Sequence, residues 1–333
     1  ESLQIICIGS NKNQYINENT KLYITELNSE NIIRILNTIN SIDFAIIGPD
    51  NPLKYGISDL LEHMDIRCIG PLQIYSQIES SKIFARQFIS KIGLGQYSPQ
   101  YIIIKNKEKN IDLLTSYIGQ DIVIKQNGLD GGKGVLVQGI DFNNINDIEH
   151  RFNKIDDDIL IEDKLIGDEY SLMSITDGHG NIAHFPPIKD YKRLNNNDIG
   201  PNTGGMGCFI DKNNSLPFLN NNDIYISETI NETIINELNK MGKTKNCKIG
   251  YRGILYGSYI KTSKGKIYIL EFNSRFGDPE GIIALNLLES NFYNLCLQCT
   301  LGSLNNTKLL FSNKASMGIY LVPKTYPKKL VDK

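Results

Sequence analysis

Short apolar runs alternate with amphipathic segments over the first 70 residues of the chain. The runs predicted as buried strands are residues 3–8, 43–47 and 66–69, and the segments with helical spacing are residues 30–40 and 53–64. Gly48-Pro49 and Gly70-Pro71 follow two of these strands. Alternation of this kind predicts a small parallel sheet, and ligands bind at the carboxyl edge of such sheets.

Strands predominate in the rest of the chain. The predicted helices are residues 78–92, 144–153, 223–241 and 281–301, and the predicted strands are residues 101–104, 122–124, 134–137, 159–162, 170–176, 182–185, 253–261, 266–272 and 317–322. Lys264-Gly265 is typical of a hairpin turn between two of these strands. The strands between 101 and 162 predict a compact α+β unit of about sixty residues.

Composition narrows the class of protein. A chain of 333 residues with 41% hydrophobic residues has room for roughly two or three domains. A net charge of −2 gives no basic field for nucleic acid. The six cysteines and four histidines show no metal-ligand spacing, and we expect Cys296 and Cys299 to be packing residues. Because no membrane span or export signal is visible, we expect a cytoplasmic protein.

A glycine-rich segment follows Lys125, which ends a predicted strand. Its glycines would let backbone amides approach phosphate oxygens, and its lysines add positive charge; the relevant residues are Gly131, Gly132, Lys133 and Gly134. The pattern is neither a P-loop nor a dinucleotide fingerprint. A plain hairpin loop is an equal alternative from these residues alone, but two flanking strands favour a phosphate lid.

An acidic segment, Glu162-Asp163-Lys164-Leu165, ends another strand and is followed by Glu169. The backbone of such a strand end can present donors and acceptors to a purine ring, and Glu169 could accept from ribose hydroxyl groups. The alternative is a solvated acidic linker, which the sequence alone favours.

A second glycine-rich segment runs from Gly200 to Gly207 and is preceded by Asp190, Lys192 and Arg193. We interpret it as a polar loop whose backbone amides can bind a carboxylate or an acyl phosphate. The alternative is an ordinary surface loop.

Glu271 and Asn273 alternate along a predicted strand, so their side chains should point to the same side. Two oxygen ligands on one face suit Mg²⁺ when phosphates complete its shell. Arg275 can form a fork to phosphate or carboxylate. An edge strand with solvated polar residues is the alternative. Phe272 and Phe276, which face the other way, instead indicate that this polar face is held in place.

Together these segments resemble the phosphoribosylamine–glycine ligase family of ATP-grasp enzymes, from about residue 43 to the end. The matching segments are Gly48 to Leu53, Ser81 to Ala85, Lys125 to Gly134, Asp190 to Arg193, Gly200 to Gly207, Gly253 to Tyr256 and Glu271 to Glu280. The last segment and the Gly-Pro-Asn-Thr-Gly-Gly-Met-Gly segment are highly specific, and their order and spacing fit the family.

The resemblance implies an α/β (α+β) protein with the ATP-grasp fold. The expected parts are a shortened N-terminal α/β domain with a parallel sheet at 1–78, an ATP-grasp core at 79–98 and 162–318, a mobile lid subdomain at 99–161, and the start of a truncated C-terminal domain at 319–333.

The resemblance also implies an activity and its site. The family joins glycine to 5-phosphoribosylamine, using ATP and Mg²⁺ or Mn²⁺, through glycyl phosphate and without a protein nucleophile. Nucleotide contacts would come from Lys82, Lys125, Gly131, Gly132, Lys133, Gly134, Glu162, Asp163, Lys164, Leu165, Glu169 and Lys192, and metal ligands from Glu271 and Asn273. The substrate side would comprise Gly48, Pro49, Asp50, Asp190, Gly204, Gly205, Met206 and Arg275, with Arg275, Lys125 and Asp190 as catalytic residues.

The chain departs from the family pattern at several places. Asn11 to Gln14 stand where the family has a glycine-rich phosphoribosyl loop, Tyr191 stands for histidine, Gln126-Asn127 for Ala-Asp, and Gly281-Ile282 for Thr-Gln. Two alternatives therefore stay open: a ligase with another amine acceptor, and a degenerate paralogue that binds nucleotide without turnover. Small molecules are the expected partners, without nucleic acid or membrane, and the chain could be fused to or associated with other purine-pathway enzymes.

Overall fold

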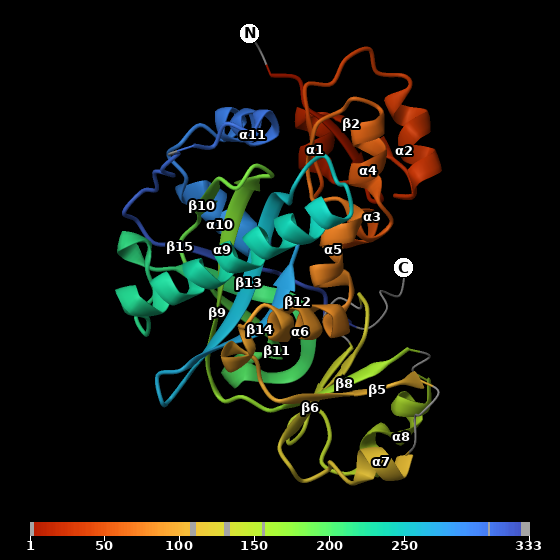
Figure 1. Cartoon of the computed structure of the whole chain (residues 1–333), viewed down its shortest axis with the longest axis vertical. Helices are drawn as coiled ribbons and strands as arrows, with labels where there is room; N and C mark the ends of the chain where they lie inside the picture. The colour runs from red at the N-terminus through yellow and green to blue at the C-terminus, as the bar shows by residue number, and fades with distance from the viewer. Residues whose placement is uncertain (1–2, 107–110, 130–133, 155–156, 306, 328–333) are drawn as a thin grey trace.

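The computed structural model describes residues 3–106, 111–129, 134–154, 157–305 and 307–327. Figure 1 shows three parts: an N-terminal α/β unit, a central body of sheets and helices, and a four-stranded unit that projects from the central body on the side away from α11 (Phe292–Leu301). Within the described residues, no helix combines the length and the apolar character needed to cross a bilayer.

The N-terminal unit contains two short pairs of parallel strands. β1 (Ile6–Gly9) pairs with β2 (Lys21–Ile24), and β3 (Ala45–Ile46) pairs with β4 (Cys68–Ile69). The helices are α1 (Gln14–Asn19), α2 (Ser29–Leu36), α3 (Asp50–Lys54) and α4 (Ile57–His63). The predicted parallel pairing is confirmed, but α1 and β2 were not foreseen. The helix predicted at 53–64 is divided by Gly56, whose φ of 80° is left-handed.

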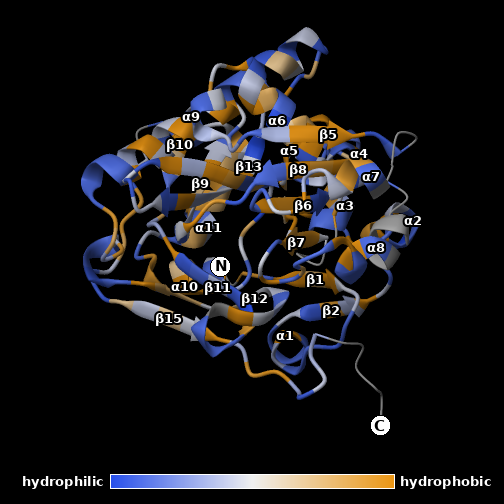
Figure 2. Cartoon of the chain, turned by 90° about the horizontal axis from the view of Figure 1, so that it is seen from below, coloured by the Kyte–Doolittle hydropathy of each residue, from blue (hydrophilic) through white to orange (hydrophobic). Residues whose placement is uncertain are grey.

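The central sheet is antiparallel, in the order β10 (Ile182–His184), β9 (Gly167–Asp177), β13 (Arg252–Thr262) and β14 (Ile267–Asn273). Leu172 faces a core built with α5 (Gln73–Ser80), α6 (Lys82–Lys91) and α9 (Asn221–Thr244), whereas its neighbour Met173 faces the core on the other side, with α10 (Glu280–Leu287) and α11. Both faces are buried, and the apolar strands therefore lie in the interior in Figure 2. The predicted hairpin joins β13 to β14.

Two predicted helices are each interrupted. The helix predicted at 78–92 is α5 (Gln73–Ser80) followed by α6 (Lys82–Lys91), because Ser81 has an extended backbone and its Oγ caps α6 by accepting from Phe84 N. The stretch predicted at 281–301 is α10 (Glu280–Leu287) and α11 (Phe292–Leu301), with Leu288 extended between them. The helix predicted at 223–241 is confirmed as α9 (Asn221–Thr244).

The segment interpreted as a glycine-rich polar loop is a strand. β12 (Ile199–Ile210) pairs with β11 (Lys189–Asn195) on one side and β15 (Ser316–Ile319) on the other. Glycine is needed because neighbouring chain approaches closely: a Cβ at Gly205 would lie 2.9 Å from the carbonyl oxygen of Asp278, and Gly205 has a φ of 154°. The loop interpretation was wrong because backbone pairing, which leaves no side-chain pattern in glycines, sets this strand.

The projecting unit is a separate antiparallel sheet with its own core. Its strand order is β5 (Tyr101–Ile104), β8 (Ile159–Asp163), β6 (Ile122–Gln126) and β7 (Val135–Val137). The helices α7 (Ile111–Thr115) and α8 (Ile145–Lys154) belong to the same unit. Ile124, Phe142 and Ile159 are among the residues of its core. All four strands were predicted.

A close contact between α9 and α5 gives a stability prediction. A Cβ at Gly242 would lie within 1.8 Å of the Tyr75 hydroxyl oxygen, and that hydroxyl is fixed by donating to Ile249 O at 2.8 Å. We expect Gly242→Ala to lower the free energy of unfolding by about 2 kcal/mol, since overpacking outweighs the gain in helix propensity. Urea unfolding measures this loss.

The matched control is Gly95→Ala. A Cβ there meets nothing within 4 Å, and the φ of Gly95 is not left-handed. The control should leave stability unchanged or raise it by about 0.5 kcal/mol. Equal effects of the two substitutions would show that the α9–α5 contact is not tight.

Candidate functional site

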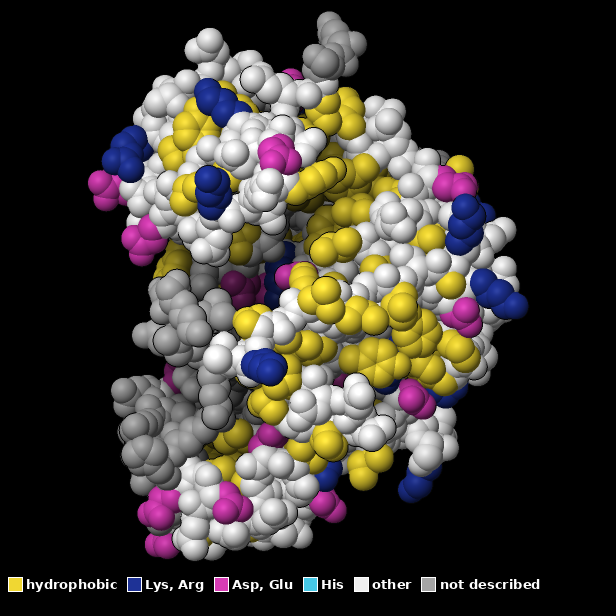
Figure 3. Space-filling view, turned by 180° about the vertical axis from the view of Figure 1, so that it is seen from behind, with side chains coloured by type: hydrophobic (Ala, Val, Ile, Leu, Met, Phe, Trp, Pro, Cys, Tyr) yellow, Lys and Arg dark blue, Asp and Glu magenta, His cyan; other side chains and the backbone are white. Residues whose placement is uncertain are grey.

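A cavity of about 1080 Å³ lies between the projecting unit and the central body. Its walls come from β6–β8, from α6, from β11 and β12, and from β14 with the turn that follows. In Figure 3 acidic and basic side chains are visible in a hollow between the lobes, framed by hydrophobic side chains. Segments far apart in sequence therefore meet around one chamber.

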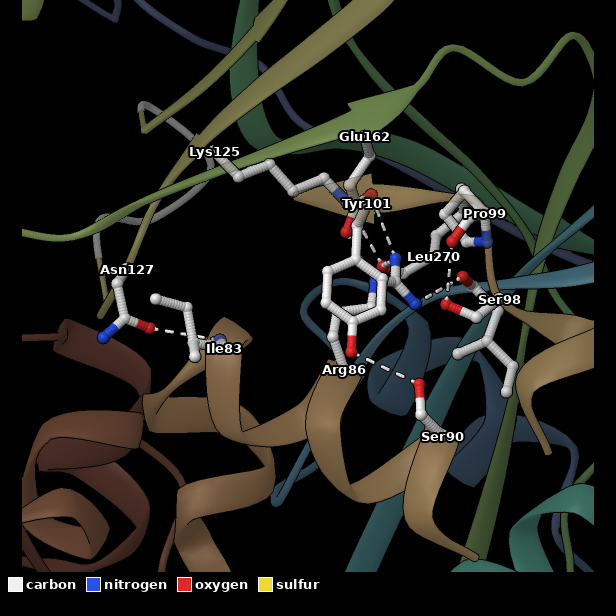
Figure 4. A network of polar contacts seen from close by, with 11 residues as sticks. Ile83, Arg86, Ser90, Ser98, Pro99, Tyr101, Lys125, Asn127, Glu162 and Leu270 are labelled. Carbon is white, nitrogen blue, oxygen red and sulfur yellow. Dashed lines mark hydrogen bonds and ion pairs between the residues drawn. The ribbon is translucent and has the colours of Figure 1, made fainter. Parts of the chain in front are cut away.

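A buried cluster of three charges forms one wall (Figure 4). The guanidinium of Arg86 on α6 forms a fork to Glu162 on β8, with N–O distances of 2.5 and 3.0 Å. The Lys125 ammonium on β6 lies 2.7 Å from the second oxygen of the same carboxylate. Although burial raises the pKa of Glu162, the charges of Arg86 and Lys125 outweigh it and lower that pKa to about 2.

The N-terminus of α6 contacts the loop that follows β6. Asn127 Oδ1 accepts from Ser81 Oγ at 3.1 Å and from the backbone N–H of Ile83 at 3.2 Å. Lys82 Nζ donates to Gly128 O at 2.7 Å and lines the cavity. Gly134 also lines it, whereas the predicted contacts Gly131, Gly132 and Lys133 lie outside the described residues.

Glu271 and Asn273 both line the cavity, on the side of β14 opposite the buried Phe272. Burial raises the pKa of Glu271, but Lys192, Lys82 and other nearby cations lower it by more than burial raises it. The net shift is downward, and the carboxylate is ionised at neutral pH. Among the described residues no group of three His, Cys, Asp or Glu could hold a metal ion. One carboxylate and one amide oxygen fit a magnesium site only if phosphate oxygens supply further ligands.

Asp190 and Lys192 on β11 face the same chamber. Lys192 Nζ lies 3.5 Å from Asp190 Oδ2 and 3.9 Å from a carboxylate oxygen of Glu169. The other oxygen of Asp190 is buried, with no hydrogen-bond partner in the described part of the chain. An unsatisfied buried carboxylate oxygen is costly, and a bound cationic ligand group would satisfy it.

A second buried acid holds Arg275, the cation predicted to bind the substrate. Glu79 at the end of α5 accepts from Ser274 N at 2.9 Å and from Ser274 Oγ at 2.7 Å, and it lies 3.2 Å from Arg275 Nε. Arg275 and Glu79 both line the cavity. Glu79 therefore fixes the turn that follows Asn273.

Glu280 is a third buried acid, at the start of α10. Tyr256 donates its hydroxyl to Glu280 Oε1 at 2.7 Å, and Oε2 has no hydrogen-bond partner among the described residues. Burial, followed by the neighbouring charge of Asp190, raises the pKa of Glu280. Glu280 and Asp190 both line the cavity, and each has one carboxylate oxygen with no hydrogen-bond partner among the described residues.

The predicted site residues are mostly brought together. Lining residues include Lys82, Lys125, Gly134, Glu162, Asp163, Lys164, Leu165, Glu169, Asp190, Lys192, Gly204, Met206, Glu271, Asn273, Arg275 and Asp50. Gly48 and Pro49 are described, yet they are exposed and do not line the cavity. Gly205 is described and does not line it either; it packs on Asp278, and its N–H donates to Thr203 Oγ1.

Four functional candidates were not singled out from the sequence: Arg86, Glu79, Tyr256 and Glu280. Glu79, Lys82 and Arg86 have the spacing i, i+3, i+7, which would have shown a polar stripe along the segment predicted as one helix. Glu280 was within the specific segment that ends at that residue but was given no role. Tyr256 ended the matching segment Gly253 to Tyr256 but was likewise given no role, because the apolar strand around it shows no polar pattern.

An ion pair joins the projecting unit to the central body beside the cavity. Asp141, just after β7, forms a two-bond ion pair with Arg193 on β11, at 2.7 and 3.1 Å. Within the projecting unit, Lys164 Nζ, directly after β8, donates to Gln138 O at 2.8 Å. The unit is therefore held down at its β7 end by groups that lie at the rim of the chamber.

The chain also resembles known proteins. Residues 2–79 match the phosphoribosylglycinamide synthetase N domain, and residues 80–281 match the phosphoribosylglycinamide synthetase ATP-grasp (A) domain. The phosphoribosylamine–glycine ligase of Methanocorpusculum labreanum is 34% identical over 87% of this chain and 65% of its own length. The phosphoribosylamine–glycine ligase of Methanococcus maripaludis is 38% identical over 86% of this chain and 64% of its own length.

A solved structure agrees with these matches. The phosphoribosylamine–glycine ligase of Thermotoga maritima superposes with a TM-score of 0.72 at 25% identity, covering 95% of this chain and 74% of that one. The chain spans about two thirds of the length of the curated relatives named above. The expected ATP-grasp fold, with a parallel-sheet unit at its N-terminus, is confirmed. Since the two family domains cover residues 2–281 in order, the chain belongs to the phosphoribosylglycinamide synthetase family.

Proposed function

We propose that this chain is an ATP-dependent ligase that joins glycine to 5-phosphoribosylamine through glycyl phosphate, giving glycinamide ribonucleotide, ADP and phosphate. The observation that carries the proposal is the single chamber lined at once by Lys125, by Glu271 with Asn273, and by Asp190 with Arg275. These groups match a nucleotide phosphate tail, a divalent cation and a small zwitterionic substrate, respectively. The activity carried in the names of both curated relatives supports the same assignment.

The nucleotide would bind along β6 and β8. Lys82 and Lys125 bring positive charge to the phosphates, together with the segment ending at Gly134. The backbone of Glu162–Leu165 would border the adenine, and Glu169 would accept from the ribose. Lys192, between Asp190 and Glu169, would contact the phosphate at the acceptor end.

Glu271 and Asn273 would hold the divalent cation, Mg²⁺ or Mn²⁺, through one carboxylate and one amide oxygen. When bound, such a cation would neutralise charge on the two outer phosphoryl groups. Glu271 contributes by remaining ionised, which the nearby lysines favour.

Glycine would bind between Asp190, Glu280 and Arg275. The unsatisfied oxygens of Asp190 and Glu280 match an ammonium group, and the Arg275 guanidinium matches a carboxylate. A glycine carboxylate oxygen attacks the γ-phosphorus, and the bond to the β–γ bridging oxygen breaks to release ADP. The acceptor amine then attacks the acyl carbon, the bond from that carbon to the phosphate oxygen breaks, and the departing phosphate takes up one N–H proton as the amide forms. No protein nucleophile is needed, because the residues act by position and charge.

Residues 99–161 would act as a lid over this chamber. Closure would keep water from the acyl phosphate, and opening would require breaking the Asp141–Arg193 ion pair and the Asn127 contacts with α6. The division into core, lid and shortened N-terminal domain, at the boundaries expected from sequence, is part of this proposal.

A different amine acceptor is the second candidate, and one observation favours it. Among the described residues, none before Asp50 lines the chamber, although the family places a phosphoribosyl-binding loop near the N-terminus. In this chain Asn13 instead caps α1 by accepting from Ile16 N. Fusion to or association with other purine-pathway enzymes stays a prediction.

Phosphate release tests the proposal. The chain is supplied with MgATP and glycine, and then with 5-phosphoribosylamine, with other small primary amines, or with no acceptor. We expect phosphate release that requires both glycine and 5-phosphoribosylamine. Phosphate release with glycine and another amine, but not with 5-phosphoribosylamine, would support the second candidate. Nucleotide binding without any acceptor-dependent phosphate release would identify a degenerate paralogue and overturn both candidates.

A further inference from the structure

Arg86, Glu162 and Lys125 form a buried charge cluster, and the proposed nucleotide contacts give Arg86 no role. Glu162 is 3% exposed, and its carboxylate points to the two cations (Figure 4). Its carboxylate is therefore engaged by Arg86 and Lys125.

The hydrogen bonds show which acceptors the N–H groups of Arg86 and Lys125 use. Arg86 uses two nitrogens for the Glu162 fork and also donates to the carbonyls of Ile269 at 3.0 Å and Leu270 at 2.8 Å. Lys125 donates to Leu270 O at 3.2 Å and pairs with one Glu162 oxygen. An ammonium has three N–H groups, so Lys125 keeps one with no acceptor in the described part of the chain.

The net charge of the cluster also depends on Arg86. Two cations and one carboxylate leave the cluster with one net positive charge. Without Arg86 the carboxylate would be neutralised by Lys125 alone, and the pair would present no net charge to an anionic ligand. Because the cluster is buried, this difference is weakly screened.

We infer that Arg86 is a positioning residue that neutralises Glu162 and thereby leaves the Lys125 ammonium available to the nucleotide phosphates. Its two bonds to the β14 backbone also tie α6 to the strand that continues into Glu271 and Asn273. The inference rests on the proposed function, because it requires Lys125 to meet a nucleotide.

The test measures binding of a non-hydrolysable ATP analogue with Mg²⁺ by calorimetry, on the whole chain. Arg86→Gln removes the charge, Arg86→Lys keeps it, and Arg34→Met is a control at an exposed arginine on α2. We expect Arg86→Gln to weaken binding at least about tenfold, as for loss of one charge-assisted contact, and Arg86→Lys to weaken it no more than about threefold. The control should bind like the parent chain.

A double substitution separates charge from packing. Arg86→Gln with Glu162→Gln leaves Lys125 as the only charge of the cluster and restores one net positive charge. We expect it to recover most of the affinity lost in Arg86→Gln, which a role in packing alone would not produce. Because it removes the carboxylate that has lost its arginine partner, it also serves where the single variant does not fold.

The outcomes are distinguishable. A parent chain that does not bind the analogue overturns the proposed function and this inference with it. A parent that binds, with Arg86→Gln binding equally well, overturns only the inference. Equal losses in Arg86→Gln, Arg86→Lys and the double variant would assign Arg86 a purely structural role and also overturn it.

Discussion

Glu271→Gln is expected to lower turnover with MgATP, glycine and acceptor by about 10²–10³-fold, the range for loss of one preorganised charged group at a reacting centre. The substitution keeps the size of the side chain but removes the charge that, under the proposed function, would hold the cation beside Asn273. The apparent affinity for Mg²⁺ should fall with it. Phosphate release measured as a function of Mg²⁺ concentration gives both values.

The control is Glu30→Gln, the same chemical change at an exposed position on α2. It should leave turnover and Mg²⁺ dependence unchanged. Full turnover by Glu271→Gln, at the Mg²⁺ concentration that saturates the parent, would remove Glu271 from the metal site. Thermal unfolding of both variants shows whether either change acts through the fold.

Glu162→Gln is expected to destabilise the chain by about 3–5 kcal/mol, because it leaves the buried charges of Arg86 and Lys125 without a carboxylate. The matched control is Glu237→Gln, which breaks an ion pair of 2.6 Å with Lys240 on the surface of α9. That loss should be under about 1 kcal/mol. Urea unfolding at neutral pH compares the two, and equal losses would show that the buried cluster gives no net stability.

The pH dependence of that difference follows from the pKa of Glu162. Its folded-state pKa of about 2 lies below the unfolded value, so the ionised carboxylate stabilises the fold above the unfolded pKa. This contribution, about 3 kcal/mol, is lost as pH falls from about 5 to 2. The stability gap between parent and Glu162→Gln should therefore narrow on acidification. A gap that widened between pH 6 and pH 4 would contradict a depressed pKa.

Local periodicity was sufficient for most of the fold. The strands and turn of the β13–β14 hairpin and the long helix α9 have strong, uninterrupted patterns, and their predicted bounds differ from the structure by only a few residues. Predictions were wrong where a single residue redirects the backbone, as Ser81 does between α5 and α6. They were also wrong for β12, since glycines carry no side-chain period.

Some site residues could likewise be placed from local patterns, and others could not. The shared face of Glu271 and Asn273 follows from the two-residue period of a strand, so the sequence was enough to place both on one side. The role of Arg86 could not be foreseen, because its partners lie 76 residues away in Glu162 and 183 residues away in Ile269. Contacts at that separation depend on how whole elements pack, and no local pattern records them.

The amino-acid sequence by itself determined most of the strands and helices, the family motifs and the paired oxygens of β14, because each depends on neighbours a few positions apart. Only the tertiary structure decided that β12 is a paired strand and that Glu79, Glu280 and Arg86 belong to the chamber. The physical reason is that a buried charge is tolerated only where distant elements supply its counter-charge and hydrogen bonds, and folding alone brings those groups together.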